Sequence, residues 1–303
     1  MIDLLSHVKW FNSDKVIAQP SLNNTEWLVV VILLIAGLLA FRFADQWLVK
    51  SKTRKNLDKK LKPLRLWVPL VVRISTSLLL AINVTHDYLL APNVTSDGSS
   101  TSNLISGLFI VAAVLIGLGL WNKAGALTLL AGYLLILTKA DFVDVLDHFE
   151  YVGIAGYLWL RGPGKHSLDN YLQKKKLTAP DLRKHSLTFY RTSIGIGLAT
   201  LGLSEKLLNT TAAQDFLNQY DWNVLSAVGV SDRWFIVVAG SVELLVGLAL
   251  IFNYASRLLI LVVLALMLLT AVLLGIDEIY GHLFAVGAVA VLLVHDEKPA
   301  KRD

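Results

Sequence analysis

The chain has 303 residues, 55% of them hydrophobic, and a mean hydropathy of +0.58. Soluble globular proteins are about 45–50% apolar, and runs of about 20 apolar residues mark membrane helices. The composition excludes an ordinary water-soluble domain and predicts an integral membrane protein in a lipid bilayer. The net charge of +5 does not indicate nucleic-acid binding, because the basic residues cluster in loops between apolar runs, as cytoplasmic loops do.

The amino-terminal stretch HVKWFNSDKV looks at first like a cold-shock strand that stacks aromatic rings on nucleic-acid bases. The glycine-aromatic alternation of such a strand does not continue beyond it. We interpret the stretch as a short segment before the membrane, with Trp10 and Phe11 at the interface. The chain contains no cysteine, which excludes disulfides, iron–sulfur clusters and thiol relays carried by this chain.

Apolar runs predict an all-α transmembrane helical bundle with about nine spans. The loop at 50–65 is rich in lysine and arginine against a single acid, Asp58, and the loop at 161–184 is also basic. Because basic loops stay in the cytoplasm, we expect the amino terminus outside and the carboxyl terminus inside the cell membrane. The expected spans are 27–44, 66–90, 104–120, 124–140, 141–160, 187–208, 234–252, 255–274 and 277–294.

An internal repeat divides the chain. The segment RISTSLLLAINVTHDYLLA from Arg73 aligns without a gap with RTSIGIGLATLGLSEKLLN from Arg191, and DVLDHFEYVG aligns with EIYGHLFAVG. Both copies enter the membrane from the same side, so we predict a parallel duplication of a four-helix unit. The expected organisation is an amino-terminal helix with a basic cytoplasmic loop (1–65), a first unit (66–169), a basic linker (170–186) and a second unit (187–303).

The segments FYRTSIGIGLATLGLSEKLL and GSVELLVGLALIFNYASRLL resemble the DoxX family of small four-helix membrane proteins. The ending RGPGKHSLD is similar to the glycine-proline-glycine, serine-leucine-aspartate close of that family. The resemblance covers about residues 66–169 and 187–296, as a tandem DoxX protein with an added amino-terminal helix. The family includes DoxD, the membrane subunit of a thiosulfate:quinone oxidoreductase, so the resemblance implies redox chemistry at the membrane with quinone as the cofactor.

Two acid–histidine pairs are the strongest candidates for chemistry. Asp144 precedes His148 by four residues, and Glu278 precedes His282 by four, which predicts that each pair shares one helix face. A carboxylate beside an imidazole fixes its tautomer and suits it to proton transfer or ligand binding. The alternative is that all four are interfacial residues that hydrogen-bond loop backbone.

Other ionisable residues accompany these pairs. His86-Asp87 and Glu205-Lys206 align at the outer ends of the first helices of the two units, where charge is also common for interfacial reasons. Asp141, Asp147 and Glu150 are interpreted as a solvated acidic rim beside Lys139.

Glu243 lies in the middle of an apolar run. A lone carboxylate at that depth costs about 3 kcal/mol, so we expect it to be protonated or paired with a histidine, a lysine or Arg191. Positive-inside anchoring also explains Arg73 and Arg191.

We therefore predict a membrane subunit of a quinone-linked oxidoreductase, with Asp144, His148, Glu278 and His282 as proton-handling residues. The residues expected to bind the cofactor are His86, Asp87, Glu205, Glu243 and Arg191. No metal ligands are assigned. Because the chain has no cysteine or flavin motif, electrons would come from a bound cofactor or a redox partner protein on the outer side. The alternatives are a transporter or binding protein for a small solute or metal cation, and a non-catalytic membrane scaffold.

Overall fold

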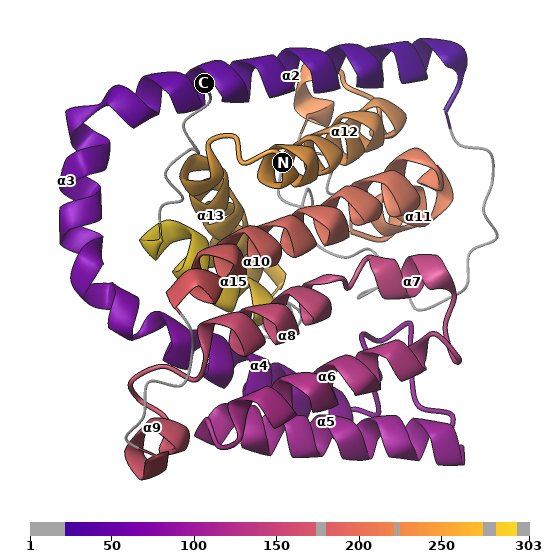
Figure 1. The fold of residues 1–303 in the computed structure, drawn as a ribbon. Helices are drawn as coiled ribbons and strands as arrows, with labels where there is room; N and C mark the ends of the chain where they lie inside the picture. The colour runs from indigo at the N-terminus through magenta and orange to yellow at the C-terminus, as the bar shows by residue number, and fades with distance from the viewer. Residues whose placement is uncertain (1–21, 174–179, 221–222, 224, 275–282, 296–303) are drawn as a thin grey trace.

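The computed structural model describes residues 22–173, 180–220, 223, 225–274 and 283–295. Every regular element in these residues is a helix, which confirms the all-α class, and one isolated bridge joins Tyr88 to Thr95. The long helix α2 lies along one edge of the bundle, and α3 continues from it around one end (Figure 1). The elements up to residue 173 are α2 (Asn24–Lys50), α3 (Lys52–Leu61), η2 (Lys62–Leu66), α4 (Val68–Thr85), α5 (Ser100–Leu118), α6 (Asn122–Ile136), α7 (Phe142–Leu146), α8 (Glu150–Arg161) and α9 (Leu168–Gln173).

The second half begins with a long helix that loosens into a π-helical turn before it ends. Two apolar helices follow, separated from it by a short amphipathic helix, and a further apolar helix comes last. The elements after residue 179 are α10 (Pro180–Leu201), the π-helical turn η3 (Gly202–Leu207), α11 (Thr210–Tyr220), η4 (Ser226–Val228), α12 (Asp232–Ile251), α13 (Ser256–Leu274) and α15 (Leu283–Val294).

Polar caps start the apolar helices. Asn23 accepts a hydrogen bond from the Glu26 backbone N–H at 3.0 Å, and Glu26 accepts one from the Asn23 backbone at 2.8 Å, which forms a capping box on α2. Ser99 and Ser231 cap α5 and α12, and their side chains accept from the backbone N–H groups of Ser102 and Trp234. The Glu26 carboxylate also forms an ion pair with Arg233 on α12, so the cap of α2 holds this helix against the bundle.

Glycines allow the main helix pairs to approach closely. A Cβ atom added to Gly247 on α12 would lie 2.5 Å from the backbone nitrogen of Ala199 and 2.6 Å from the carbonyl oxygen of Gly195, both on α10. A Cβ atom added to Gly117 on α5 would lie 2.7 Å from the Ser77 hydroxyl on α4. The pairs α10–α12 and α4–α5 therefore pack through small residues, as is common for membrane helices.

Two further helix pairs join the halves of the chain. Helix α8 packs against α10, and α15 packs against α4. A Cβ atom added to Gly153 on α8 would lie 2.7 Å from Ser193 Cβ on α10, and one added to Gly287 on α15 would lie 3.1 Å from the Ser75 hydroxyl on α4. The pairs α8–α10 and α4–α15 thus connect residues 66–169 with residues 187–295.

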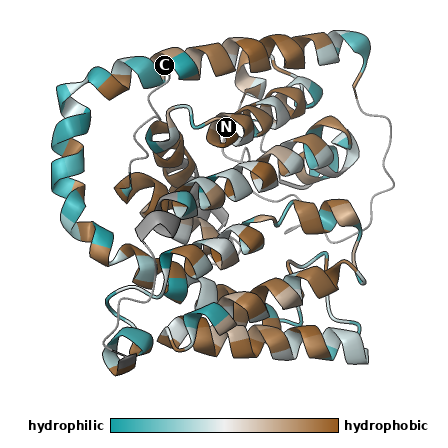
Figure 2. Cartoon of the chain, viewed as in Figure 1, coloured by the Kyte–Doolittle hydropathy of each residue, from teal (hydrophilic) through white to brown (hydrophobic). Residues whose placement is uncertain are grey.

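Within the described residues, four helices are long and apolar enough to cross a membrane: α2, α4, α5 and α12. Shorter apolar helical segments occur in α6, α13 and α15. Hydrophobic residues make up most of the length of these helices (Figure 2), and large apolar side chains such as Leu104 and Val114 on α5 are more than half exposed. An outward-facing apolar surface of this kind fits an integral membrane protein, whereas nine spans and their orientation stay predictions.

Two expected elements differ in the structure. The basic segment at 50–65, expected as a loop, forms α3, because Ser51 caps the helix by accepting from the Arg54 N–H at 3.1 Å and lysine, arginine and leucine favour helix. The expected single span at 141–160 is broken at 147–149, where α7 ends and α8 begins. This break turns three polar side chains inward and creates the candidate site.

Candidate functional site

The turn between α7 and α8 places a histidine between two acids. Helix α7 ends at Leu146, and the His148 backbone N–H bonds the Val145 carbonyl at 3.2 Å in the turn that follows. The His148 ring lies with Nδ1 3.3 Å from Glu150 Oε1 and Nε2 3.6 Å from Asp147 Oδ1. All three side chains are buried. We refer to Asp147, His148 and Glu150 as the acid–histidine cluster.

This geometry corrects the predicted pairing on a shared helix face. Asp144 lies half-buried on α7, but α7 is too short to include His148, so the four-residue helical spacing does not apply. The interpretation of Asp147 and Glu150 as a solvated rim was wrong, because both are buried beside the imidazole. The sequence signal for them was the run Asp-His-Phe-Glu itself, with acids one and two positions from the histidine.

Aromatic side chains form one wall of the cluster. The His148 ring meets the Tyr151 ring edge-on with 6.4 Å between centroids, and Tyr151 stacks with Tyr133 at 5.8 Å and with Phe109 at 6.0 Å. The amide of Asn83 on α4 donates to the Tyr151 hydroxyl at 2.9 Å. These contacts connect α4, α5 and α6 to α8 and fix the position of the cluster.

Helix α10 closes the cluster from another side. A Cβ atom added to Gly197 would lie 2.9 Å from the Asp147 carbonyl oxygen and 3.3 Å from Glu150 Oε2. The absence of a side chain at this position brings the α10 backbone close to both acids. The acid–histidine cluster is therefore enclosed by helices from both halves of the chain.

The predicted central carboxylate, Glu243 on α12, is fully buried and paired with a lysine. Lys206 Nζ lies 2.8 Å from each carboxylate oxygen of Glu243. Lys206 reaches it from the π-helical turn η3, which also carries the buried Glu205. The sequence led us to expect a histidine, a lysine or Arg191 as the partner of Glu243, and in the structure this partner is a lysine.

Arg191 and Arg73 are buried, and both donate hydrogen bonds to backbone carbonyl groups. Arg191 donates from Nη1 to the carbonyl oxygens of Leu250 and, at 2.9 Å, Ile251, which close α12. Arg73 donates to the His166 carbonyl, and a Cβ atom at Gly119, the C-cap of α5, would collide with its guanidinium. Both side chains therefore bind backbone groups within the bundle, and their positive-inside anchoring stays a prediction.

His86 and Asp87 are exposed at the carboxyl end of α4. His86 Nδ1 lies 3.0 Å from the Ile82 carbonyl oxygen, and Asp87 adopts a left-handed backbone conformation with φ 58°. Neither residue takes part in the contacts described above for the acid–histidine cluster. Glu278 and His282 lie outside the described residues.

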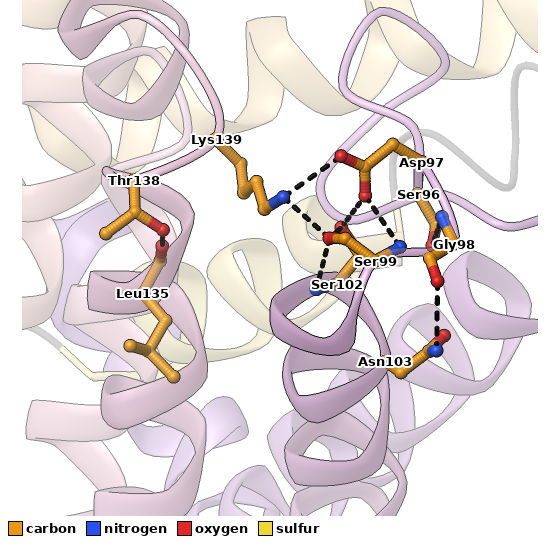
Figure 3. A network of polar contacts seen from close by, with 9 residues as sticks. All are labelled: Ser96, Asp97, Gly98, Ser99, Ser102, Asn103, Leu135, Thr138 and Lys139. Atoms are coloured by element: carbon orange, nitrogen blue, oxygen red, sulfur yellow. Dashed lines mark hydrogen bonds and ion pairs between the residues drawn. The ribbon is translucent and has the colours of Figure 1, made fainter.

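The loop before α5 holds a separate polar network (Figure 3). Asp97 accepts from the Ser102 hydroxyl at 2.6 Å and from the Ser99 backbone at 3.1 Å, and Lys139 lies 3.0 Å from its other oxygen. The hydrogen bond from Ser102, followed by those from Ser99 and Lys139, holds the pKa of the Asp97 carboxyl below its usual range. Lys139 thus binds the α5 cap, and this network is a structural link between two loops.

Within the part of the chain that the structure describes, no group of three or more His, Cys, Asp or Glu side chains is arranged to hold a metal ion. Comparison with protein-family models, with curated proteins and with solved structures gave no match. The resemblance to the DoxX family therefore rests on the quoted sequence segments and stays a prediction.

Proposed function

We propose that this integral membrane protein exchanges protons with a quinone at the acid–histidine cluster. The observation that carries the proposal is the buried His148 ring, which lies between the carboxylates of Asp147 and Glu150. Ionisable groups are costly inside a membrane protein and are usually kept for a function. Histidine with adjacent carboxylates is suited to general acid–base chemistry near neutral pH.

The quinone part of the proposal rests on the resemblance to the DoxX family. Reduction of a quinone to a quinol consumes two electrons and two protons. The cluster would supply the protons, and a redox partner protein on the outer side would supply the electrons, since this chain has no cysteine. Helix α7 exposes Phe142 and Val143 beside the cluster, which gives a lipid-soluble ring an apolar approach.

The proposal includes two parallel four-helix units. Residues that the sequence alignment pairs make corresponding contacts: Gly117 meets Ser77 as Gly247 meets Gly195. The same holds across the halves, where Gly153 meets Ser193 as Gly287 meets Ser75. In the sequence alignment, Glu278 and His282 correspond to Asp144 and His148.

A binding titration with a soluble quinone analogue tests the function. We expect the purified wild-type protein to bind the analogue and His148→Gln to bind it at least about tenfold more weakly, because one charge-assisted hydrogen bond is lost. His185→Gln is the matched control, since His185 is exposed and lies away from the cluster in sequence. Equal binding by wild type and His148→Gln would contradict the assignment of the site, and no binding by wild type would contradict the quinone assignment.

The proposed topology places the amino terminus outside and α3 inside the cell. Because the natural chain has no cysteine, single-cysteine variants give labelling without background. We expect Ser100→Cys, at the start of α5, to react with a membrane-impermeant maleimide on intact cells. Lys55→Cys on α3 should react only after the membrane is opened, and the reverse pattern would contradict the orientation.

A further inference from the structure

A cavity of about 160 Å³ lies where α2 turns into α3. Helix α3 and the carboxyl end of α2 form one wall, and α10, α13 and α15 form the others. The proposed acid–histidine cluster does not line it. Helix α3 passes around this end of the bundle (Figure 1). The cavity lies between α3 and the rest of the bundle.

Leucine side chains from every wall make the larger part of the cavity surface apolar. They come from α2, α3, α10, α13 and α15 and are Leu48, Leu57, Leu187, Leu258, Leu261 and Leu292. Such a surface suits a hydrocarbon chain. The volume is below the about 300–1,000 Å³ of pockets that enclose a whole drug-sized ligand, so only part of a longer molecule would fit inside.

Basic side chains line the same cavity. Arg54 of α3, Arg191 of α10 and Arg257 of α13 contribute guanidinium groups. Two carboxylates face them: Asp45 lies 4.0 Å from Arg54, and Asp58 lies 2.5 Å from Arg257. Of the described residues that line the cavity, three are arginines and one is an acid, Asp45, while Asp58 lies close to Arg257.

His295 adds a directed donor. Its Nε2 lies 2.8 Å from Arg161 Nη2, which can only donate, so Nε2 accepts and Nδ1 carries the proton. His295 lines the cavity and is 8% exposed, and its Nδ1 has no hydrogen-bond partner among the described residues. Burial, and then the charges of Arg161, Arg65 and Arg257, lower the pKa of His295 to about 3. The ring is therefore neutral at pH 7, and its buried N–H donor lies near the Val291 carbonyl, which acts to raise the pKa.

We propose that this cavity binds an anionic phospholipid from the leaflet on the α3 side. The phosphate would bind the arginines and the His295 N–H, and the start of one acyl chain would lie against the leucines while the rest stays in the bilayer. Basic pockets between membrane helices are suited to anionic head groups, and arginine suits phosphate in particular. The inference is independent of the proposed quinone chemistry.

Native mass spectrometry of the full chain with phosphatidylglycerol tests the proposal. We expect Arg54→Gln to weaken retention of this lipid about tenfold, because a charge-assisted hydrogen bond is lost. Lys55→Gln is the matched control, since it removes the same charge from an exposed neighbour that does not line the cavity. Equal losses in the two variants would show diffuse attraction to a basic surface and overturn the site.

A second pair of variants tests the cavity itself. Thr53 lines it, whereas Asn56 on the same helix does not, and both are exposed. We expect Thr53→Trp to fill the cavity and abolish retention, and Asn56→Trp to leave it unchanged. Three results would each overturn the proposal. The first is retention of zwitterionic phosphatidylcholine equal to that of phosphatidylglycerol. The others are displacement of the lipid by inorganic phosphate at a similar concentration, and full retention of the lipid by Thr53→Trp.

Discussion

Replacing Lys206 with methionine is expected to destabilise the protein by about 3 kcal/mol. The lysine Nζ contacts both oxygens of the fully buried Glu243 carboxylate at 2.8 Å. Without this partner, Glu243 must keep an uncompensated charge or take up a proton in an apolar environment. Thermal unfolding of the purified protein in detergent measures the loss.

The double variant Lys206→Met/Glu243→Leu separates the ion pair from the packing of its side chains. It replaces both charges with apolar groups of similar size, which is often neutral for buried ion pairs. We expect it to recover most of the stability that Lys206→Met loses. A Lys206→Met protein as stable as wild type would show that the pair does not hold η3 to α12.

Introducing a methyl group at Gly247 is expected to cost about 2 kcal/mol, because it overpacks the contact between α10 and α12. The new Cβ atom of Gly247→Ala would lie 2.5 Å from the Ala199 backbone nitrogen and 2.6 Å from the Gly195 oxygen. Backbone atoms cannot move aside as a flexible side chain can, so the helices must separate. Thermal unfolding is again the measurement.

Gly107→Ala is the matched control for this change. Gly107 also lies inside an apolar helix, α5, but an added Cβ atom would have no neighbour within 4 Å. Alanine is favoured over glycine in a helix, so we expect a gain of about 0.5 kcal/mol. Equal effects of the two substitutions would mean that α10 and α12 do not approach as closely as described.

Apolar runs were sufficient to predict an all-helical membrane protein, because length and hydropathy decide that class. They were not sufficient to place every boundary. The basic segment at 50–65 has three leucines among many charged residues, yet it forms α3, because the Ser51 cap and the helix propensity of its residues act locally. The break between α7 and α8 is not predicted, because the segment at 141–160 is interpreted as one span even though acids and a histidine interrupt its apolar residues.

That break decides how much of the site could be predicted. His148 was identified as a candidate, but a continuous helix would direct Asp147 and Glu150 away from it. The turn at 147–149 instead brings both acids to the imidazole. The partner of Glu243 was limited to a few residue types by the need for charge compensation, but the choice of Lys206 depends on the π-helical turn, which no sequence pattern indicated.

Counting the protons exchanged on quinone binding tests the central proposal most directly. Isothermal titration calorimetry of the analogue in buffers of different ionisation enthalpy gives this number for wild type and for His148→Gln. The acid–histidine cluster predicts net proton uptake or release by wild type that is lost in His148→Gln and kept in His185→Gln. Binding with no proton exchange in wild type, or with the same exchange in His148→Gln, would contradict a proton-handling role for this cluster.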